Sequence, residues 1–556
     1  MSGVLNVTAT VTETASVPVV LTAPPSGLSL SVAYGGTTGV FDPTVNGIDL
    51  GPYVDPQGAF VQGCIKTTCP ALPAMTVFFR SDADGSRDEI VVELGAIAGT
   101  PPAPAAPFGP AMGSYTATVI KNGVTLATDA LPGHYWRSRW RWQSAPRPVR
   151  TTVAQLVAAG LIPQFDFSIC PATKSYAPQS YTPMTMAGLT SYEPETGERG
   201  DIGLVTEWQA DWLDTQTPAT LATMLAQAEA MATFPWHYRD EATGAPYDAL
   251  ANAHASTYTP NAGASPLIAN PQVKIDGAFL IPDQAHMVEG SWLPFLLTGD
   301  PYHLETMQFQ VVFSLLTMPP ASRYGTGGGP RAFCWPVRTC GRTAVATPAA
   351  VPGWLLPKAW FETVLGNYMA WMDKSIAMVP PAPEASFRVI SQTPLGANPA
   401  CFDFWMSDML TAVLEDLYRL GRVEVLPRLT WQLGSLLART NGTSGWPRGV
   451  PTMYNCFMTN AGPGTMPTTW AALFANNVLL QPAAMVFDPS DPTGNAKLSL
   501  PNGGAMTYIS YARGVLAMAC RRGDPDAVAP FAFLDPQVRA LCAANKASVD
   551  RKWCFA

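Results

Sequence analysis

The sequence predicts a multidomain β + α protein, in which a β-sandwich-like domain over residues 1–150 precedes an α/α toroid over residues 151–556. Three observations predict this class. Before residue 150, apolar and polar side chains alternate at the period of a strand, and after it apolar residues recur at helical spacing. The chain also has 556 residues, which exceeds one ordinary hydrophobic core, so two or more domains are expected.

The first 150 residues are expected to form antiparallel strands. Short runs of apolar and β-branched residues alternate with polar ones, and turn residues such as Asn122-Gly123 separate them. Asp82, Asp84 and Asp88 suggest calcium ligands, but the glycine between them is misplaced for an EF-hand loop, so the sequence favours a solvated hairpin turn. The expected strands are 5–11, 17–21, 75–80, 89–94, 115–120 and 124–126.

The segment 135–142 alternates aromatic and cationic residues at period two, which predicts a strand with one Trp-rich face and one Arg-rich face. Such a strand can stack nucleobases or sugars. The favoured interpretation is structural: the tryptophans pack on the following domain, and the arginines pair with carboxylates.

Beyond residue 150, helices are joined by long connections rich in Pro, Gly and Asn. Roughly ten to twelve helices after an all-β domain predict a toroid, either incomplete or (α/α)6-like, whose concave face is built from loops and helix starts. An irregular helical array is the alternative. Helices are expected over 151–159, 218–231, 283–297, 301–317, 358–378, 404–420, 423–440, 468–480, 505–520 and 535–546.

The stretch 283–305 predicts a helix, a tight corner and a second helix. The Gly-Asp-Pro sequence at 299–301 supplies the corner, because glycine suits the end of a helix, aspartate the N-cap and proline the first turn. Asp283 and His286 are expected on one side of the first helix, at its polar start.

The composition limits the classes of partner. Hydrophobic residues make up 47% of the chain and charged residues 13%, yet no apolar run of about 18 residues occurs, so no membrane insertion is expected. A net charge of −8 argues against nucleic acid as a partner, because phosphate binding relies on Lys and Arg. A surface so poor in charge favours assembly, as a homo-oligomer or with other proteins.

Cysteines and histidines give no sign of a metal centre. The pairs Cys64/Cys69 and Cys334/Cys340 lack zinc-ligand spacing, so loop disulfides or free buried thiols are favoured. With five scattered histidines, neither a metal nor another cofactor is expected. The N-terminal residues also lack the charged and apolar regions of a secretory signal, so we expect the protein to stay in the cell or to leave it by another route.

Polar clusters at 198–203, 207–209, 234–241 and 283–286 contrast with this charge-poor background. Hydrolysis of a polysaccharide needs a proton donor and a second carboxylate, for which Asp201, Asp240 and Asp283 are available. A lyase instead needs a base and a group that neutralises the uronate carboxylate.

For lyase chemistry the base would be His237, Tyr238 or His286, and the neutralising cation Arg239 or Arg199. Tryptophan faces offer surfaces on which sugar rings stack. The catalytic candidates are thus Asp201, His237, Tyr238, Arg239, Asp283 and His286, and the substrate-binding candidates are Arg199, Trp208, Trp236, Asp240, Trp335, Asp403 and Trp405.

Each candidate also has a purely structural interpretation. Asp283 precedes a helix and suits an N-cap as well as catalysis. Arg239 and Asp240 suit a local ion pair, and Asp201 suits a turn between two glycines. Asp403, at another helix start, suits a cap and a site equally.

Segments 198–203, 237–244, 283–287 and 297–302 resemble a group of bacterial and phage or prophage proteins that are similar to α/α-toroid carbohydrate-active enzymes. The resemblance covers about residues 130–420. It implies a β-sandwich followed by an α/α toroid, of the kind found in glycoside hydrolases and polysaccharide lyases, and a carbohydrate context.

The first hypothesis is therefore a phage- or prophage-type, virion-associated protein that binds or cleaves bacterial surface polysaccharide through the concave face of the toroid. It would be made in the cytoplasm and act in the virion or outside the cell. Its sharp prediction is that Asp201, His237, Arg239, Asp283 and His286 converge on one pocket. If they are scattered or sealed in the core, the enzymatic version is lost.

A second hypothesis is a non-enzymatic structural subunit of a phage tail or capsid assembly. A third is a cytoplasmic enzyme that acts on imported oligosaccharides and needs only the pocket.

Overall fold

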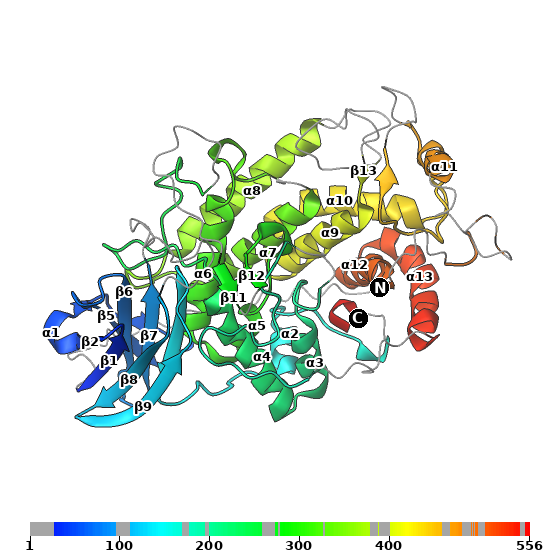
Figure 1. Ribbon diagram of the computed structural model, residues 1–556. Helices are drawn as coiled ribbons and strands as arrows, with labels where there is room; N and C mark the ends of the chain where they lie inside the picture. Colours follow the sequence, from blue (N-terminus) through cyan, green and yellow to red (C-terminus); the bar gives the residue numbers. More distant parts are fainter. Residues whose placement is uncertain are drawn as a thin grey trace.

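In a computed structural model of the protein, antiparallel β-sheets in the first part of the chain are followed by a helical region (Figure 1). This order confirms the predicted β + α class, whereas the toroid and the domain boundary near residue 150 stay predictions. The strands predicted over 5–11 and 17–21 lie outside the described residues. The structure describes residues 27–95, 112–169, 177–194, 199–257, 273–275, 278–325, 329–378, 387–388, 401–458, 467–480, 491, 493, 495–498, 506–544 and 551–556.

The outer layer is a four-stranded antiparallel sheet. The hairpin predicted at its edge is confirmed, since Asn122 and Gly123 have positive φ angles of 52° and 77° and join two antiparallel strands. One face of this sheet buries Leu30, Val32 and Val119 in the core that it shares with the second sheet. In spatial order the strands are β2 (Thr37–Phe41), β1 (Leu28–Tyr34), β8 (Tyr115–Lys121) and β9 (Val124–Leu131).

The second sheet forms the middle layer and is covered on both faces. Val77 and Val92 join the core shared with the outer sheet, while Phe78 and Val91 pack against helices. Every residue of the interior strand β7 is therefore buried, and the predicted hairpin between β6 and β7 is confirmed. Its strands are, in spatial order, β10 (Ser138–Gln143), β7 (Asp88–Leu94), β6 (Met75–Asp82), β5 (Val61–Thr68) and β3 (Ile48–Asp49), with β4 (Tyr53–Val54) also paired to β5.

Helices occur at most positions where helical spacing predicted them. Their starts follow the sequence signals: Thr217 and Asp300 cap two helices whose first residue is proline, and the Asp300 carboxylate accepts the Tyr302 N–H at 3.1 Å. The helices are α1 (Pro43–Asn46) within the β part, then α2 (Val153–Ala158), α3 (Glu207–Thr215), α4 (Pro218–Ala230), α5 (Trp292–Thr298), α6 (Pro301–Leu316), α7 (Pro330–Ala346), α8 (Lys358–Met378), α9 (Phe404–Arg419), α10 (Leu426–Thr440), α11 (Trp470–Leu480), α12 (Met506–Arg522) and α13 (Pro525–Ala544).

The continuous helix predicted over 283–297 is wrong. The chain makes a single 3-10 turn, η3 (Gln284–His286), then runs without helix until α5. The Glu289 carboxylate accepts the Trp292 N–H at 2.9 Å, so this side chain stabilises the new helix start. The corner at 299–301 is confirmed, because Gly299 ends α5 with a φ of 66°.

Helix α7 was not predicted, although it packs against α6, α8, α9 and η3. A glycine-rich segment precedes it, and Pro336 lies inside it. Both features indicate a loop when only neighbouring residues are considered. Burial of Phe333, Trp335 and Val337 in the core overrides that local preference.

The middle sheet and helix α6 are joined by buried ion pairs. Glu305 accepts hydrogen bonds from Arg80 at 2.9 Å, from Arg239 at 2.7 Å and from Arg139, and all four side chains are buried. Burial alone would raise the pKa of Glu305, but the three guanidinium groups hold it well below its usual range.

Strand β10 explains the alternation of Trp and Arg at 135–142. Its arginines pair with carboxylates, as the favoured interpretation predicts; Arg141, for example, donates to Asp300 at 2.6 Å. The tryptophans, however, do not pack on the helices as expected. Trp140 lies between the two sheets, where its indole N–H donates to the Tyr115 hydroxyl at 2.7 Å. The arginines, not the tryptophans, face the helices.

The cysteine pairs Cys64/Cys69 and Cys334/Cys340 are free thiols, which confirms one of the two favoured alternatives. No helix among the described residues is long and apolar enough to cross a membrane. Four short strands form two further antiparallel pairs, β11 (Val273–Ile275) with β12 (Ala278–Leu280), and β13 (Cys401–Phe402) with β14 (Cys456–Phe457).

Candidate functional site

The five side chains expected to meet in one pocket do not do so. His237 and Arg239 lie in the interface between the middle sheet and α6, with 0% and 3% exposure. Asp201 lies instead beside the segment that carries Asp283 and His286, and it is also buried, with 1% exposure. The sequence-predicted residues therefore form two groups.

Arg239 is a structural residue, not a free cation for a substrate carboxylate. Its guanidinium donates to both oxygens of Glu93 at 2.9 Å and to Glu305 at 2.7 Å. Burial lowers its pKa, but these carboxylates outweigh burial and raise it. Because all of this lies inside the protein, the interpretation of Arg239 as a uronate-neutralising group is wrong.

His237 and Tyr238 are also sealed in this interface. The Nδ1–H of His237 donates to the Arg137 carbonyl at 2.9 Å, and burial lowers the pKa of the imidazole well below its usual range. The Tyr238 ring lies 4.3 Å from the Arg137 guanidinium, and burial raises its pKa. Neither side chain reaches a surface, so neither is a base for a polysaccharide.

Of the other candidates, Trp236, Trp335 and Asp240 are structural too, whereas the role predicted for Trp208 stays a prediction. Trp236 and Trp335 have 0% exposure and belong to the core, so they do not stack sugars. Trp208 is half-buried and its ring lies beside Gly200. The Asp240 carboxylate accepts the backbone N–H of Thr243 at 2.8 Å and so closes a turn, rather than pairing with Arg239.

Arg199 and Asp201 position the segment that precedes the second group. Arg199 donates to the Asp201 carboxylate at 3.0 Å and to the His286 carbonyl at 3.1 Å. The other Asp201 oxygen accepts the Thr190 N–H at 2.8 Å. These bonds tie the chain around residue 200 to η3, so Asp201 acts as a support and not as a proton donor to a ligand.

Asp283 and His286 form a pair at the start of η3. The Asp283 carboxylate bonds to Nδ1 of His286 and makes no N-cap hydrogen bond, so the capping alternative is wrong. The Asp283 side chain is 28% exposed, whereas that of His286 is 9% exposed. Asp283 is therefore the member of this group that reaches solvent.

Glu193 lies against this pair and was missed by sequence reasoning. One oxygen of its buried carboxyl accepts the Asp283 N–H, and the other has no partner in the described part of the chain. Burial raises its pKa well above the usual range, and the nearby Asp283 and Asp201 add to that rise. Its position in a polar segment just ahead of the cluster at 198–203 was the available signal.

Asp403 lies at the N-cap position of α9 without making a cap bond. Burial raises its pKa to about 6, although the nearby Arg331 opposes the shift. Arg331, the second residue of α7, has its own pKa lowered by burial, and the Asp283 and Asp403 carboxyls both oppose that shift. The Arg331 guanidinium thus lies within electrostatic reach of both carboxyls. Sequence reasoning missed Arg331, because nothing in the sequence around it marks a site residue.

An aromatic stack adjoins this group. Trp405 is 2% exposed, so it does not offer a face to a ligand. The Tyr454 ring lies over it, with centroids 6.0 Å apart and planes 12° from parallel, and Tyr454 is 47% exposed. The exposed aromatic face is therefore that of Tyr454, which sequence reasoning missed because it lies in a long irregular connection.

Chemically, η3 and the starts of α7 and α9 offer the Asp403 carboxyl with its raised pKa, the partly exposed Asp283 carboxyl and the Arg331 guanidinium within electrostatic reach of both. The exposed ring of Tyr454 adjoins them. Within the described residues, no three His, Cys, Asp or Glu side chains are arranged to hold a metal ion. No family model, no curated protein and no solved structure matches this chain, so any function assigned to it depends on this geometry.

Proposed function

We propose that this protein binds a bacterial surface polysaccharide where the starts of η3, α7 and α9 meet, and that it hydrolyses the glycan there. Asp403 is the proton donor and Asp283 the second carboxyl. In this proposal the chain is a virion-associated protein of a phage or prophage, and the described helices belong to an α/α toroid whose helix starts line the binding face.

One observation carries the proposal: the Arg331 guanidinium lies 5.4 Å from the centre of the Trp405 ring, at the start of α9, and the Asp283 and Asp403 carboxyls are both among the groups that raise its pKa. Glycoside hydrolysis uses two carboxyl groups with different tasks, one protonated and one ionised. A pKa of about 6 keeps Asp403 partly protonated under mildly acidic to neutral conditions, as a proton donor requires. Asp283 is partly exposed and is held by His286, which fixes the orientation of its carboxylate.

The aromatic stack supports a carbohydrate ligand. Sugar rings pack their C–H faces on exposed aromatic rings, and Tyr454 presents one that Trp405 holds from behind. The Trp405 indole N–H also donates to the Tyr454 carbonyl at 3.2 Å, which fixes the backbone of the exposed tyrosine. This arrangement is preorganised for a flat ligand.

The proposal replaces part of the first hypothesis. Its five-residue pocket is lost, and with it the lyase version that used His237, Tyr238 and Arg239, because these groups are sealed in a structural interface. By the criterion stated for that hypothesis, its enzymatic version is lost. The hydrolysis proposed here is a new assignment: it keeps Asp283, takes Asp403 from the substrate-binding candidates as the proton donor, and adds binding through Tyr454.

A reducing-end assay on purified capsular polysaccharides tests the proposal. We expect the wild-type chain to release reducing ends from its cognate polymer, and Asp403→Asn and Asp283→Asn each to lower the rate by about 10²–10⁴-fold. Tyr454→Ala should instead weaken glycan binding. The control is Asp240→Asn, since Asp240 only closes a turn. Equal rates in wild type and both site variants would reject the assignment.

A non-enzymatic subunit of a tail or capsid assembly is the second candidate, and exposed apolar residues on the outer sheet favour it. Val40 is 56%, Val124 62% and Leu126 47% exposed, on its two edge strands. Such residues are suited to contact another subunit or a second copy of the chain. Glycan binding without any release of reducing ends would favour this candidate over the hydrolase.

A further inference from the structure

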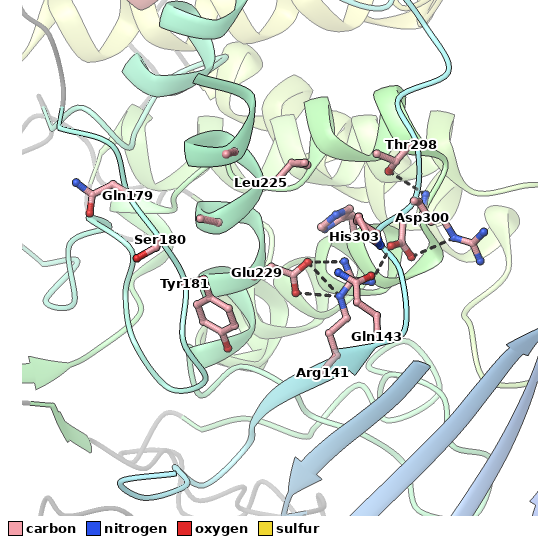
Figure 2. Close-up of a pocket in the computed structure, with 14 residues that line it drawn as sticks. Arg141, Gln143, Gln179, Ser180, Tyr181, Leu225, Glu229, Thr298, Asp300 and His303 are labelled. Carbon is pink, nitrogen blue, oxygen red and sulfur yellow. Dashed lines mark hydrogen bonds and ion pairs between the residues drawn. The ribbon is translucent and has the colours of Figure 1, made fainter. Parts of the chain in front are cut away.

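A cavity lies between strand β10 and helices α4 and α6 (Figure 2), and neither Asp283 nor Asp403 is among the residues that line it. Its volume is about 410 Å³. This value falls within the range of about 300–1,000 Å³ that is typical of small-molecule pockets, which often lie between structural units. In Figure 2, Gln179 and Tyr181 lie on one side of α4, and Asp300 and His303 lie on the other.

The charges around this cavity are paired with one another. Arg141 donates to Glu229 at 2.9 Å and to Asp300 at 2.6 Å. Arg147, which also lines the cavity, donates to both oxygens of Asp82, at 3.0 and 2.8 Å. An anionic ligand would therefore meet Glu229 and Asp300, and a cationic ligand would meet two arginines.

Uncharged hydrogen-bonding groups remain available. His303 is 2% exposed, and its Nδ1 has no partner in the described part of the chain. Burial lowers the pKa of His303 to about 4, so the ring is neutral at physiological pH. Ser180, on the opposite wall, is a second uncharged group that lines the cavity.

Helix α4 adds an apolar strip. Ala222, Leu225 and Ala226 line the cavity at helical spacing, close to the polar groups of Glu229 and His303. A sugar ring has the complementary properties: hydroxyl groups around its rim, an apolar C–H face and no net charge.

From this combination we infer that the cavity binds a neutral, hydroxyl-rich ligand of about monosaccharide size. The inference does not depend on the proposed hydrolysis, because none of the residues that line the cavity belongs to the Asp283 and Asp403 group. If this inference and the proposed hydrolysis are both correct, the cavity binds a sugar that the protein does not cleave there.

Saturation-transfer NMR on the full chain, with D-glucose, D-galactose, D-mannose and N-acetyl-D-glucosamine as probes, tests the inference. We expect at least one sugar to bind saturably, with a dissociation constant in the millimolar range that is usual for such small ligands. Ala222→Trp places an indole in the cavity without removing an ion pair, and it should weaken that binding by about tenfold or more.

The matched control is Ala219→Trp, an exposed position in the first turn of the same helix that does not line the cavity. It should bind the sugar as the wild type does, and so should Tyr454→Ala, the variant expected to weaken glycan binding at the other site. No binding of any probe overturns the inference, as does wild-type affinity in Ala222→Trp. Loss of sugar binding in Tyr454→Ala would also overturn it, because the sugar would then occupy the other site.

Discussion

Replacing Glu305 by glutamine removes the negative charge on which three buried arginines converge. Arg80 would keep Glu89 at 3.3 Å, and Arg239 would keep both oxygens of Glu93. Arg139 would keep only neutral acceptors, the Tyr302 carbonyl and the Thr306 hydroxyl, at 2.9 and 2.7 Å. The Glu305→Gln variant thus leaves one buried guanidinium without a charged partner.

The expected loss of stability follows from the one guanidinium, that of Arg139, which loses its charged partner. Removing one partner of a buried ion pair costs about 3–5 kcal/mol, because the remaining charge stays desolvated. The free energy of unfolding of a domain is typically about 5–15 kcal/mol, so the loss is a large fraction of it. Because the pKa of Glu305 is depressed, its contribution is present above the usual glutamate pKa of about 4.3 and disappears as the pH falls through the depressed value.

Urea unfolding at pH 7 and at pH 3.5, followed by tryptophan fluorescence, measures both effects. The matched control is Glu362→Gln, which breaks a pair with Arg422 whose two side chains are 31% and 18% exposed. A surface pair of this kind is worth about 0–1 kcal/mol. The reasoning is refuted if Glu305→Gln costs no more than the control at pH 7, or if its cost grows as the pH falls.

Three further predictions concern buried acids and histidine. Glu193→Gln should be more stable than the wild type at pH 8, and by a larger margin than at pH 5, because the raised pKa of Glu193 means that the wild type loses stability as the pH rises above about 4.3. Thermal unfolding of both proteins at both pH values checks this, and a variant less stable than the wild type at pH 8 would contradict it. On a cognate glycan, the hydrolysis rate should fall as the pH rises through about 6, where Asp403 loses its proton, and a flat pH–rate profile between pH 5 and 8 would exclude Asp403 as the donor. His237→Leu should cost about 0.5–1.5 kcal/mol, because the buried Arg137 carbonyl loses the imidazole donor but keeps the backbone N–H of residue 237 at 3.1 Å. The folded variant should bind glycan as the wild type does, and weakened binding measured by affinity electrophoresis would return His237 to the site.

The sequence predicted best what depends on neighbouring residues. Asn122-Gly123 produced the expected hairpin, and the Gly-Asp-Pro corner at 299–301 formed as expected. Helix α7 was not predicted, because burial of its side chains in the core is what stabilises it. The break between η3 and α5 was not predicted either, because the Glu289 carboxylate stabilises a separate start for α5. These are long-range effects that no local pattern contains.

The residues of the candidate site show the same contrast between features that depend on neighbouring residues and features that depend on long-range contacts. Asp283 and Asp403 were named as candidates because each is a carboxylate at the start of a helical segment. Glu193, Arg331 and Tyr454 were missed, since only the folded chain brings them together. The opposite error, at Arg239 and its neighbours, arose because scarce charges were interpreted as a surface site. In this chain many charged side chains lie inside, where they pair with each other.

Because the arginines of β10 face the helices, the β part of the chain is not a removable module. Its middle sheet depends on Glu305 and Asp300 of the α6 start for counter-charges and on α5 and α6 for cover of its second face. A recombination event near residue 150 would join that sheet to helices that lack these carboxylates. A substitution of a β10 arginine would therefore have to be matched by a change of its carboxylate partner at the start of α6, on the other side of that boundary.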